Sequence, residues 1–161
     1  MKRHFIIPDT QVSPGHPIDH MTWIGLAIEE YRPDVVIHLG DHWDMASLSA
    51  WSQAGSADKE GKRYRADIDA GNDALWELEK AISGYSATGK GFKPKRKVIL
   101  RGNHEQRIER VTSADPRLLG AIGYHDFNDR ELGWEVVDYL SLIHISEPTR
   151  RTERSRMPSS A

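Results

Sequence analysis

The chain has 161 residues, of which 38% are hydrophobic, and this is enough for one domain with a single core. It contains no cysteine, so disulfide scaffolds, thiolate metal sites and cysteine nucleophiles are excluded. A formal net charge of −2 gives no basic excess for sequence-independent nucleic-acid binding, although a local basic groove, as in a nuclease, stays open.

The sequence carries no recognisable targeting segment. Its N-terminal residues include basic side chains, but the apolar run that follows is too short for a signal peptide. No apolar stretch reaches the length of about 18 residues that crosses a bilayer. We therefore expect a soluble, cytoplasmic protein without a membrane partner.

The first forty residues predict a strand, a helix and a second strand. Residues 5–7 form a short apolar run that ends at a proline. A helix is predicted from Asp19, because apolar residues recur at helical spacing as far as Tyr31, and Pro33 ends it. Residues 35–39 are apolar almost throughout, which is typical of a strand covered on both faces.

The later elements continue the alternation of strands and helices. After residue 40 we predict a short helix at 45–51, an amphipathic helix at 64–82, a strand at 98–100, a helix from about Glu105, a short helix that starts at 115–116 and a strand at 133–139. This order indicates the α/β class, with a mainly parallel sheet and flanking helices.

Hard oxygen ligands follow three of the predicted strands. Asp9 follows the first strand, Asp41 the second and Asn103 the third, and Gly40 and Gly102 allow tight turns before the last two. Because parallel strands end at one edge of a sheet, we expect these side chains to lie together. Such oxygens suit Mn²⁺, Mg²⁺ or Fe, and an aspartate can bridge the two cations of a hydrolytic site.

Three motifs containing these residues resemble the signature of the calcineurin-like metallophosphoesterases. They are Asp9-Thr10-Gln11, Gly40-Asp41-His42-Trp43-Asp44 and Gly102-Asn103-His104-Glu105, and the chain is most similar to members carried by bacteriophages. The resemblance implies an α/β sandwich that hydrolyses phosphate mono- or diesters with metal-activated water. It also implies two divalent metal ions, Mn²⁺ first and Fe, Zn²⁺ or Mg²⁺ as alternatives, and a phosphate-ester substrate, with nucleic acid as one candidate.

The resemblance further implies a role for each motif residue. Asp9 would bind the first metal ion, Asp41 would bridge both ions, and Asn103 would bind the second. His104 would lie near the phosphate as leaving-group acid or transition-state donor. Glu105 would orient His104.

Other polar residues near these motifs are open to more than one interpretation. Gln11 stands where the family usually has a histidine ligand, so its amide oxygen would coordinate weakly or leave that place to water. Arg101 is either a phosphate contact or a helix-capping or surface residue. His42 and Asp44 are expected to line the pocket, with a helix-capping role equally open for Asp44. His38, inside a strand, is expected to support the core rather than bind metal.

Residues 140–161 have a different origin in our interpretation. Residues 140–150 match the translation of a transposase-type sequencing adapter, and residues 155–161 fit the outer part of the same adapter in one frame. We expect residues 1–139 to be a partial metallophosphoesterase domain and residues 140–161 to be a non-native, disordered tail. A natural disordered basic tail is the alternative.

The family's later histidine ligands have no counterpart before this tail. No Gly-His-x-His motif follows Glu105, and His125 lacks the expected context. We therefore expect an incomplete site and a weakly active or inactive fragment.

Two other readings remain for the chain. One is a non-catalytic module that binds a nucleotide or phosphoprotein in the same strand-end pocket. A dinucleotide-binding fold is disfavoured, because no Gly-x-Gly-x-x-Gly follows the first strand.

The basic residues at 93–97 are expected to form a solvated surface, with contact to a nucleic-acid backbone as the alternative.

Overall fold

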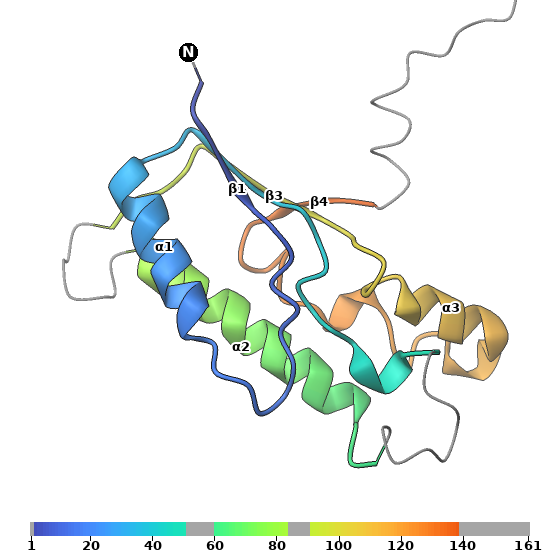
Figure 1. Ribbon diagram of the computed structural model, residues 1–161. Helices are drawn as coiled ribbons and strands as arrows, with labels where there is room; N and C mark the ends of the chain where they lie inside the picture. Colours follow the sequence, from blue (N-terminus) through green and yellow to red (C-terminus); the bar gives the residue numbers. More distant parts are fainter. Residues whose placement is uncertain (1, 51–59, 84–90, 139–161) are drawn as a thin grey trace, which may run out of the picture.

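A four-stranded parallel sheet organises the protein. The computed structural model describes residues 2–50, 60–83 and 91–138. In spatial order the strands are β1 (His4–Ile7), β2 (Val35–His38), β3 (Arg96–Leu100) and β4 (Glu135–Val137) (Figure 1). Each neighbouring pair is parallel, so the predicted strands and the α/β class are confirmed.

The register of the strands brings their carboxyl ends to one edge. Ile7 pairs with His38, and His38 pairs with Ile99. On the far side of β3, Leu100 pairs with Val137. The chain segments that leave β1, β2 and β3 therefore start beside one another, as the positions of the three motifs predicted.

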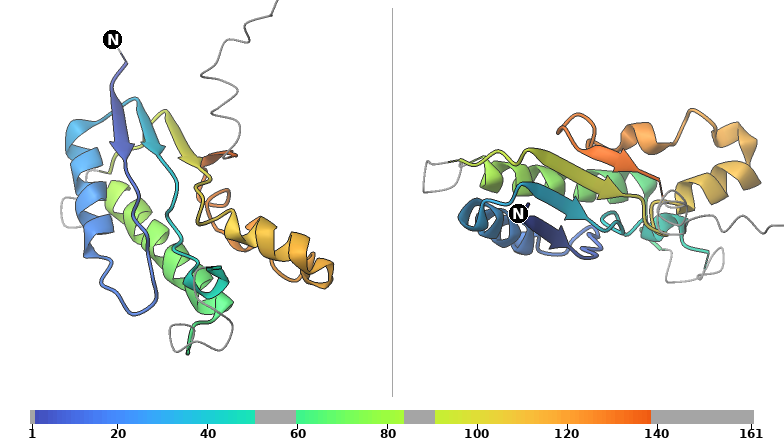
Figure 2. Two further views of the ribbon diagram at one scale, coloured as in Figure 1. Left: turned by 45° about the vertical axis from the view of Figure 1, so that its right-hand side comes forward. Right: turned by 90° about the horizontal axis from the view of Figure 1, so that it is seen from above.

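Helices α1 (Asp19–Tyr31) and α2 (Tyr64–Ile82) cover one face of the sheet (Figure 2). Helix α1 ends where Arg32 turns left-handed at φ 47° and donates its N–H to the Ile28 carbonyl. Pro33 follows and cannot continue the helix. Both helices have the bounds that the apolar periodicity predicted.

Burial along β2 alternates, so the expectation that this strand is covered on both faces is wrong for the described residues. Val36 and His38 are fully buried, whereas Val35 and Ile37 are half-buried. On β1, Ile6 is 57% exposed while Ile7 is buried. Successive side chains point to opposite faces of a strand, and the two helices lie against only one of them.

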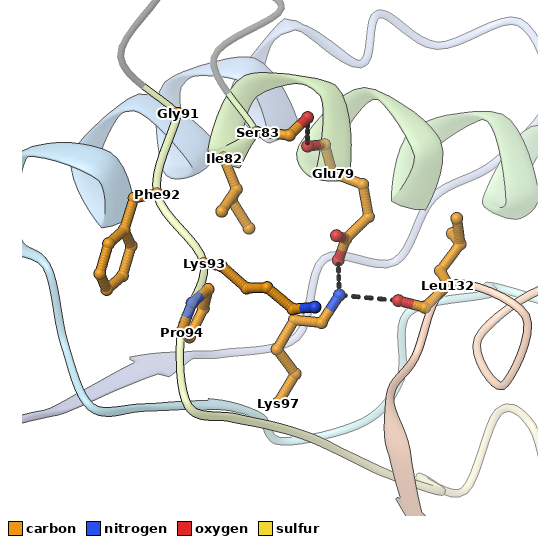
Figure 3. A pocket seen from close by; sticks show the side chains of 9 residues that line it. All are labelled: Glu79, Ile82, Ser83, Gly91, Phe92, Lys93, Pro94, Lys97 and Leu132. Atoms are coloured by element: carbon orange, nitrogen blue, oxygen red, sulfur yellow. Dashed lines mark hydrogen bonds and ion pairs between the residues drawn. The ribbon is translucent and has the colours of Figure 1, made fainter.

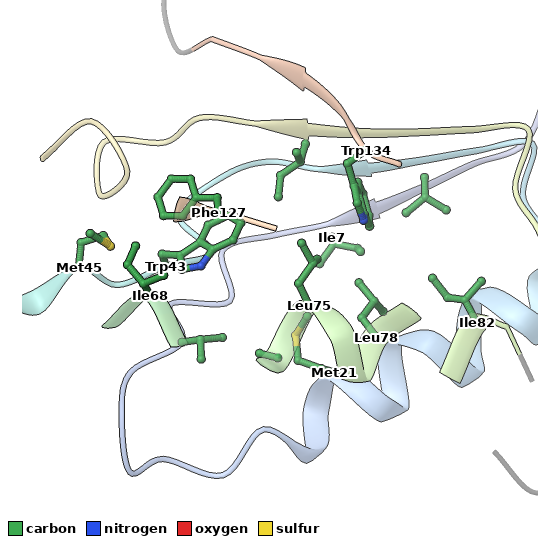
Figure 4. Close-up of a cluster of buried hydrophobic side chains, with 14 of the residues drawn as sticks. Ile7, Met21, Trp43, Met45, Ile68, Leu75, Leu78, Ile82, Phe127 and Trp134 are labelled. Carbon is green, nitrogen blue, oxygen red and sulfur yellow. The ribbon is translucent and has the colours of Figure 1, made fainter. Parts of the chain in front are cut away.

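The hydrophobic core fills the space between the sheet and these helices (Figure 4). Its largest members include Ile7, Met21, Trp43, Ile68, Leu75, Leu78, Phe127 and Trp134. The indole of Trp43 stacks on Phe127 with ring centroids 4.0 Å apart. A Cβ on Gly71 of α2 would lie 2.0 Å from the Trp43 ring, so only glycine lets the helix approach this closely.

The remaining elements are short and surround the carboxyl edge. They are η1 (Ala46–Leu48), α3 (Arg107–Ala114), η3 (Pro116–Leu118) and η4 (Tyr124–Asp126). The helices expected at 45–51, near Glu105 and at 115–116 are confirmed in shorter or shifted form, and residue 51 lies outside the described residues. The turn η4 was not predicted.

Long-range hydrogen bonds fix η4 and its surroundings to α2. The Tyr64 hydroxyl donates to Asp126 Oδ2 at 2.5 Å, and Asn72 Nδ2 donates to the Asp126 carbonyl at 2.9 Å.

None of the helices in the described ranges is long and apolar enough to cross a membrane. Residues 140–161 lie outside those ranges, so the domain boundary near residue 139 stays a prediction.

Candidate active site at the strand ends

Asp41 joins the loops that follow β1, β2 and β3. Its carbonyl accepts a hydrogen bond from the Gln11 N–H at 2.9 Å, and its Oδ1 accepts one from the His104 N–H at 2.8 Å. Gln11 and Asp41 both have left-handed backbones, at φ 42° and 50°. The three motifs predicted from the sequence thus meet around one aspartate.

Glycine is required beside Asp41 because the loops touch. A Cβ on Gly102 would lie 2.1 Å from Asp41 Oδ1, and a Cβ on Gly40 would lie 2.7 Å from the Gly102 nitrogen. Gly40 also has a positive φ of 95°, as a tight turn predicts. Gly102 instead serves the close approach of two chain segments.

Glu105 holds these loops together through its buried carboxylate. Four backbone N–H groups donate to it: Gly102 at 2.8 Å, Asp41 at 3.1 Å, His42 at 2.7 Å and Trp43 at 3.1 Å. Burial raises the pKa of Glu105, while the N–H donors act in the opposite direction because they favour the ionised form. The prediction that Glu105 orients the His104 ring is corrected, since the carboxylate is committed to these N–H groups.

Asp44 orients His104 instead. The Nδ1 atom of His104 lies 2.9 Å from the Asp44 carbonyl and 3.0 Å from Asp44 Oδ1. Both partners only accept, so Nδ1 carries the ring hydrogen and Nε2 presents a lone pair. Ser13 Oγ donates to Asp44 Oδ2 at 2.7 Å, which fixes the carboxylate. A capping role for Asp44 is not observed, because η1 has no side-chain cap.

Arg107, the first residue of α3, completes this cluster and was not predicted. Its Nη1 donates to the carbonyls of Asp44 at 2.7 Å and Met45 at 3.3 Å. Its Nη2 lies 3.2 Å from His104 Nε2. Its sequence position, one helical turn after His104, is a weak signal, because arginines are common on helices and the spacing alone does not predict a contact.

A buried chain of hydrogen bonds anchors the loop after β1. Thr10 Oγ1 lies 3.2 Å from His38 Nε2 and 2.7 Å from His42 Nδ1. At the two ends, the Gly40 N–H faces His38 Nδ1 at 3.2 Å and the Gly71 carbonyl faces His42 Nε2 at 2.9 Å. These fixed end partners require that His38 donates to Thr10 and that Thr10 donates to His42.

The same contacts correct the role expected for His42. This residue is fully buried and does not line a pocket, whereas His38 supports the core as predicted. Burial lowers the pKa of His42 to about 4 and lowers the pKa of His38 well below its usual value. Both rings are neutral, which the hydrogen-bond chain also requires.

Arg101 is neither a surface residue nor free to reach a phosphate. Its guanidinium is buried and pairs with Asp129 at 2.5 Å. It also lies over the rings of Tyr124 and Phe127, 4.9 Å and 4.8 Å from their centroids. All three interpretations made from the sequence are therefore corrected.

The basic segment at 93–97 is largely neutralised by acidic partners. Lys95 binds Asp34 at 2.7 Å and Arg96 binds Glu135 at 2.6 Å, each as an exposed ion pair. The hydrogen bond from Lys95 lowers the pKa of Asp34 to about 2. These contacts weigh against a nucleic-acid surface at this place.

Lys97 of the same segment lies beside a pocket at the amino end of β3. Figure 3 shows its Nζ between Glu79 Oε1 and the Leu132 carbonyl, both at 2.7 Å. The pocket has a volume of about 450 Å³ and is separated from Asp41 by the length of the strands. It does not contribute to the candidate site.

The expected metal ligands differ in exposure. Asp9, Gln11 and Asn103 are exposed, whereas Asp41 is only 9% exposed. These residues supply two carboxylates and two carboxamides, oxygen donors whose chemistry suits Mn²⁺ or Mg²⁺. In the described part of the chain, no group of three or more His, Asp or Glu side chains is placed to hold a metal ion.

Comparison with known proteins supports one family. The chain matches no curated protein and no solved structure. A family model described as calcineurin-like phosphoesterase matches residues 3–156, a range that includes all three motifs. This family comprises metal-dependent phosphoester hydrolases that generally use two divalent metal ions. The chain therefore belongs to the calcineurin-like phosphoesterase family.

Proposed function

We propose that this chain hydrolyses phosphate mono- or diesters by means of metal-activated water, with Asp9, Gln11, Asp41 and Asn103 as ligands and Mn²⁺ as the preferred ion. The observation that carries the proposal is the position of Asp41. Its backbone is left-handed, and it is bonded to the loops on both sides. A non-glycine residue in this conformation costs about 1–3 kcal/mol, and such strain concentrates at functional sites.

His104 is the proposed proton donor to the leaving oxygen. Because Nδ1 keeps its hydrogen on Asp44, the ring acts as an acid once Nε2 has taken up a proton from water in place of the Arg107 N–H, and this proton then passes to the leaving oxygen. The Asp44 carboxylate stabilises the ring when it is positively charged. A divalent metal ion bound beside Asp41 would supply the activated water and neutralise negative charge on the phosphate.

The first test is Mn²⁺-dependent hydrolysis of p-nitrophenyl phosphate and bis-p-nitrophenyl phosphate by the full chain. Asp41→Asn is the matched control, because asparagine is similar in size and tolerates a left-handed backbone. We expect metal-dependent product release that is largely lost in Asp41→Asn, although the incomplete ligand set predicts slow turnover. Equal rates for the two proteins would refute the proposed role of Asp41.

A non-catalytic phosphate-binding module is the second candidate. It is favoured by one observation, that His104 and Arg107 place two nitrogens 3.2 Å apart beside Asp44, where a phosphate group can be held without turnover. His104→Ala separates the two functions. A hydrolase releases product in the presence of Mn²⁺ and loses that rate in this variant, whereas a binding module takes up inorganic phosphate or a nucleotide and releases no product from either protein.

A further inference from the structure

The His104 ring offers one nitrogen to a ligand. Its Nδ1 is occupied by the carbonyl and the carboxylate of Asp44. Nε2 is therefore the ring nitrogen that a substrate meets. The side chain of His104 is 15% exposed, so part of the ring remains accessible.

Arg107 places a fixed positive charge beside this nitrogen. Arginine has only donors, so its contact with Nε2 at 3.2 Å is a donation into the ring lone pair. The guanidinium is held by the carbonyls of Asp44 and Met45, and the residue is 7% exposed. Its position is thus set before any ligand arrives, which reduces the entropy cost of binding.

We propose that Arg107 binds a phosphate oxygen of the substrate together with His104, which extends the proposed function to a named phosphate contact. A phosphate oxygen that accepts a hydrogen bond from protonated His104 Nε2 also comes within reach of Arg107 Nη2, because the two nitrogens are 3.2 Å apart. The Nη2 N–H that points at the ring in the free protein then donates to the phosphate oxygen, while Nη1 keeps its hydrogen bonds to the carbonyls of Asp44 and Met45. Hydrogen bonds between guanidinium and phosphate are among the strongest that proteins form.

The other arginines of this region fit the role less well. Arg101 is buried against Asp129 and aromatic rings. Arg110 is exposed and reaches the carbonyl of Asn103 only at 3.4 Å. Arg107 has a nearby carboxylate in Asp44, but the separation of 3.8 Å leaves the guanidinium without a direct paired hydrogen bond to it.

The test compares the full chain with Arg107→Met and Arg107→Lys. Binding of inorganic phosphate is measured by calorimetry with Mg²⁺ present, and kcat and KM are measured separately with p-nitrophenyl phosphate and Mn²⁺. We expect Arg107→Met to weaken phosphate binding and raise KM by about tenfold or more, and Arg107→Lys to recover part of this loss. Arg65→Met, which removes an exposed arginine paired with Asp69 on α2, should leave both values unchanged.

The outcomes separate this inference from the proposed function. If the wild-type chain neither binds phosphate nor hydrolyses the ester, the proposed function fails, and the role of Arg107 fails with it. If the wild-type chain does either and both Arg107 variants match it, only the role of Arg107 is overturned. Should Arg107→Met fail to melt cooperatively, Arg107→Lys decides by the same comparison, with a several-fold weaker affinity expected.

Discussion

Replacing Glu105 by glutamine should destabilise the protein strongly, although the two side chains have nearly the same shape. The carboxylate accepts four backbone N–H groups at 2.7–3.1 Å. The single amide oxygen of glutamine accepts two of them, and its NH₂ group faces the others. Each buried N–H left unpaired costs about 1–3 kcal/mol, so we expect a loss of about 4 kcal/mol.

Urea denaturation followed by tryptophan fluorescence and circular dichroism measures this loss. With an m value of about 2 kcal/mol/M, the midpoint should fall by about 2 M. This is a large part of the 5–15 kcal/mol that stabilises a typical domain, so the variant will be close to unfolding at 37 °C. Glu30→Gln, an exposed change on α1, is the control and should alter stability by less than about 0.5 kcal/mol.

A loss below about 1 kcal/mol in Glu105→Gln would refute the reasoning. It would show that the four N–H groups find other partners, such as water, when the carboxylate is removed. The loops around Asp41 would then be held by contacts other than Glu105.

Three further predictions concern the same edge of the sheet. Thr10→Val should lower the unfolding free energy by about 3 kcal/mol because it leaves two imidazole nitrogens unpaired, whereas Thr10→Ser should recover most of it; equal melting temperatures would contradict the hydrogen-bond chain. Gly102→Ala should weaken Mn²⁺ binding in a calorimetric titration, because the new Cβ would lie 2.1 Å from Asp41 Oδ1 and would push the carboxylate out of its position. Unchanged Mn²⁺ affinity would count against this geometry. Metal-free protein should lose stability as the pH falls from about 6.5 towards 4, because the pKa of His42 is about 4 in the folded state and higher in the unfolded state. In urea titrations the loss of unfolding free energy should approach about 3 kcal/mol. A urea midpoint that does not change with pH over this range would mean that the pKa of His42 is not lowered by folding.

The sequence predicted the sheet and its main helices because their signals are local. Apolar spacing places Asp19–Tyr31 and Tyr64–Ile82 in helices, and both helices have these bounds in the structure. The strand ends could be aligned because parallel strands finish at one edge. The sequence alone therefore places Asp41 beside the third motif.

The partners of the polar residues could not be predicted, because they depend on tertiary contacts. Glu105 follows His104 in sequence, but its carboxylate turns to N–H groups on a loop more than 60 residues away. Arg101 adjoins the third motif, yet its partner Asp129 lies in a segment without a recognisable pattern. Sequence proximity suggested a shared role in catalysis, whereas packing and hydrogen bonding decide where each side chain lies.

The paired basic segment has a consequence for mutagenesis. Lys95, Arg96 and Lys97 contact Asp34, Glu135 and Glu79, which belong to three different neighbours of β3. Alanine or charge-reversal scanning of this segment, a usual way to remove suspected contacts with DNA or RNA, would break these ion pairs, of which the largely buried one between Lys97 and Glu79 matters most for the attachment of β3. A variant that lost nucleic-acid binding after such substitutions would have lost it because the sheet is disturbed. The result would then be mistaken for evidence that residues 95–97 contact the nucleic acid.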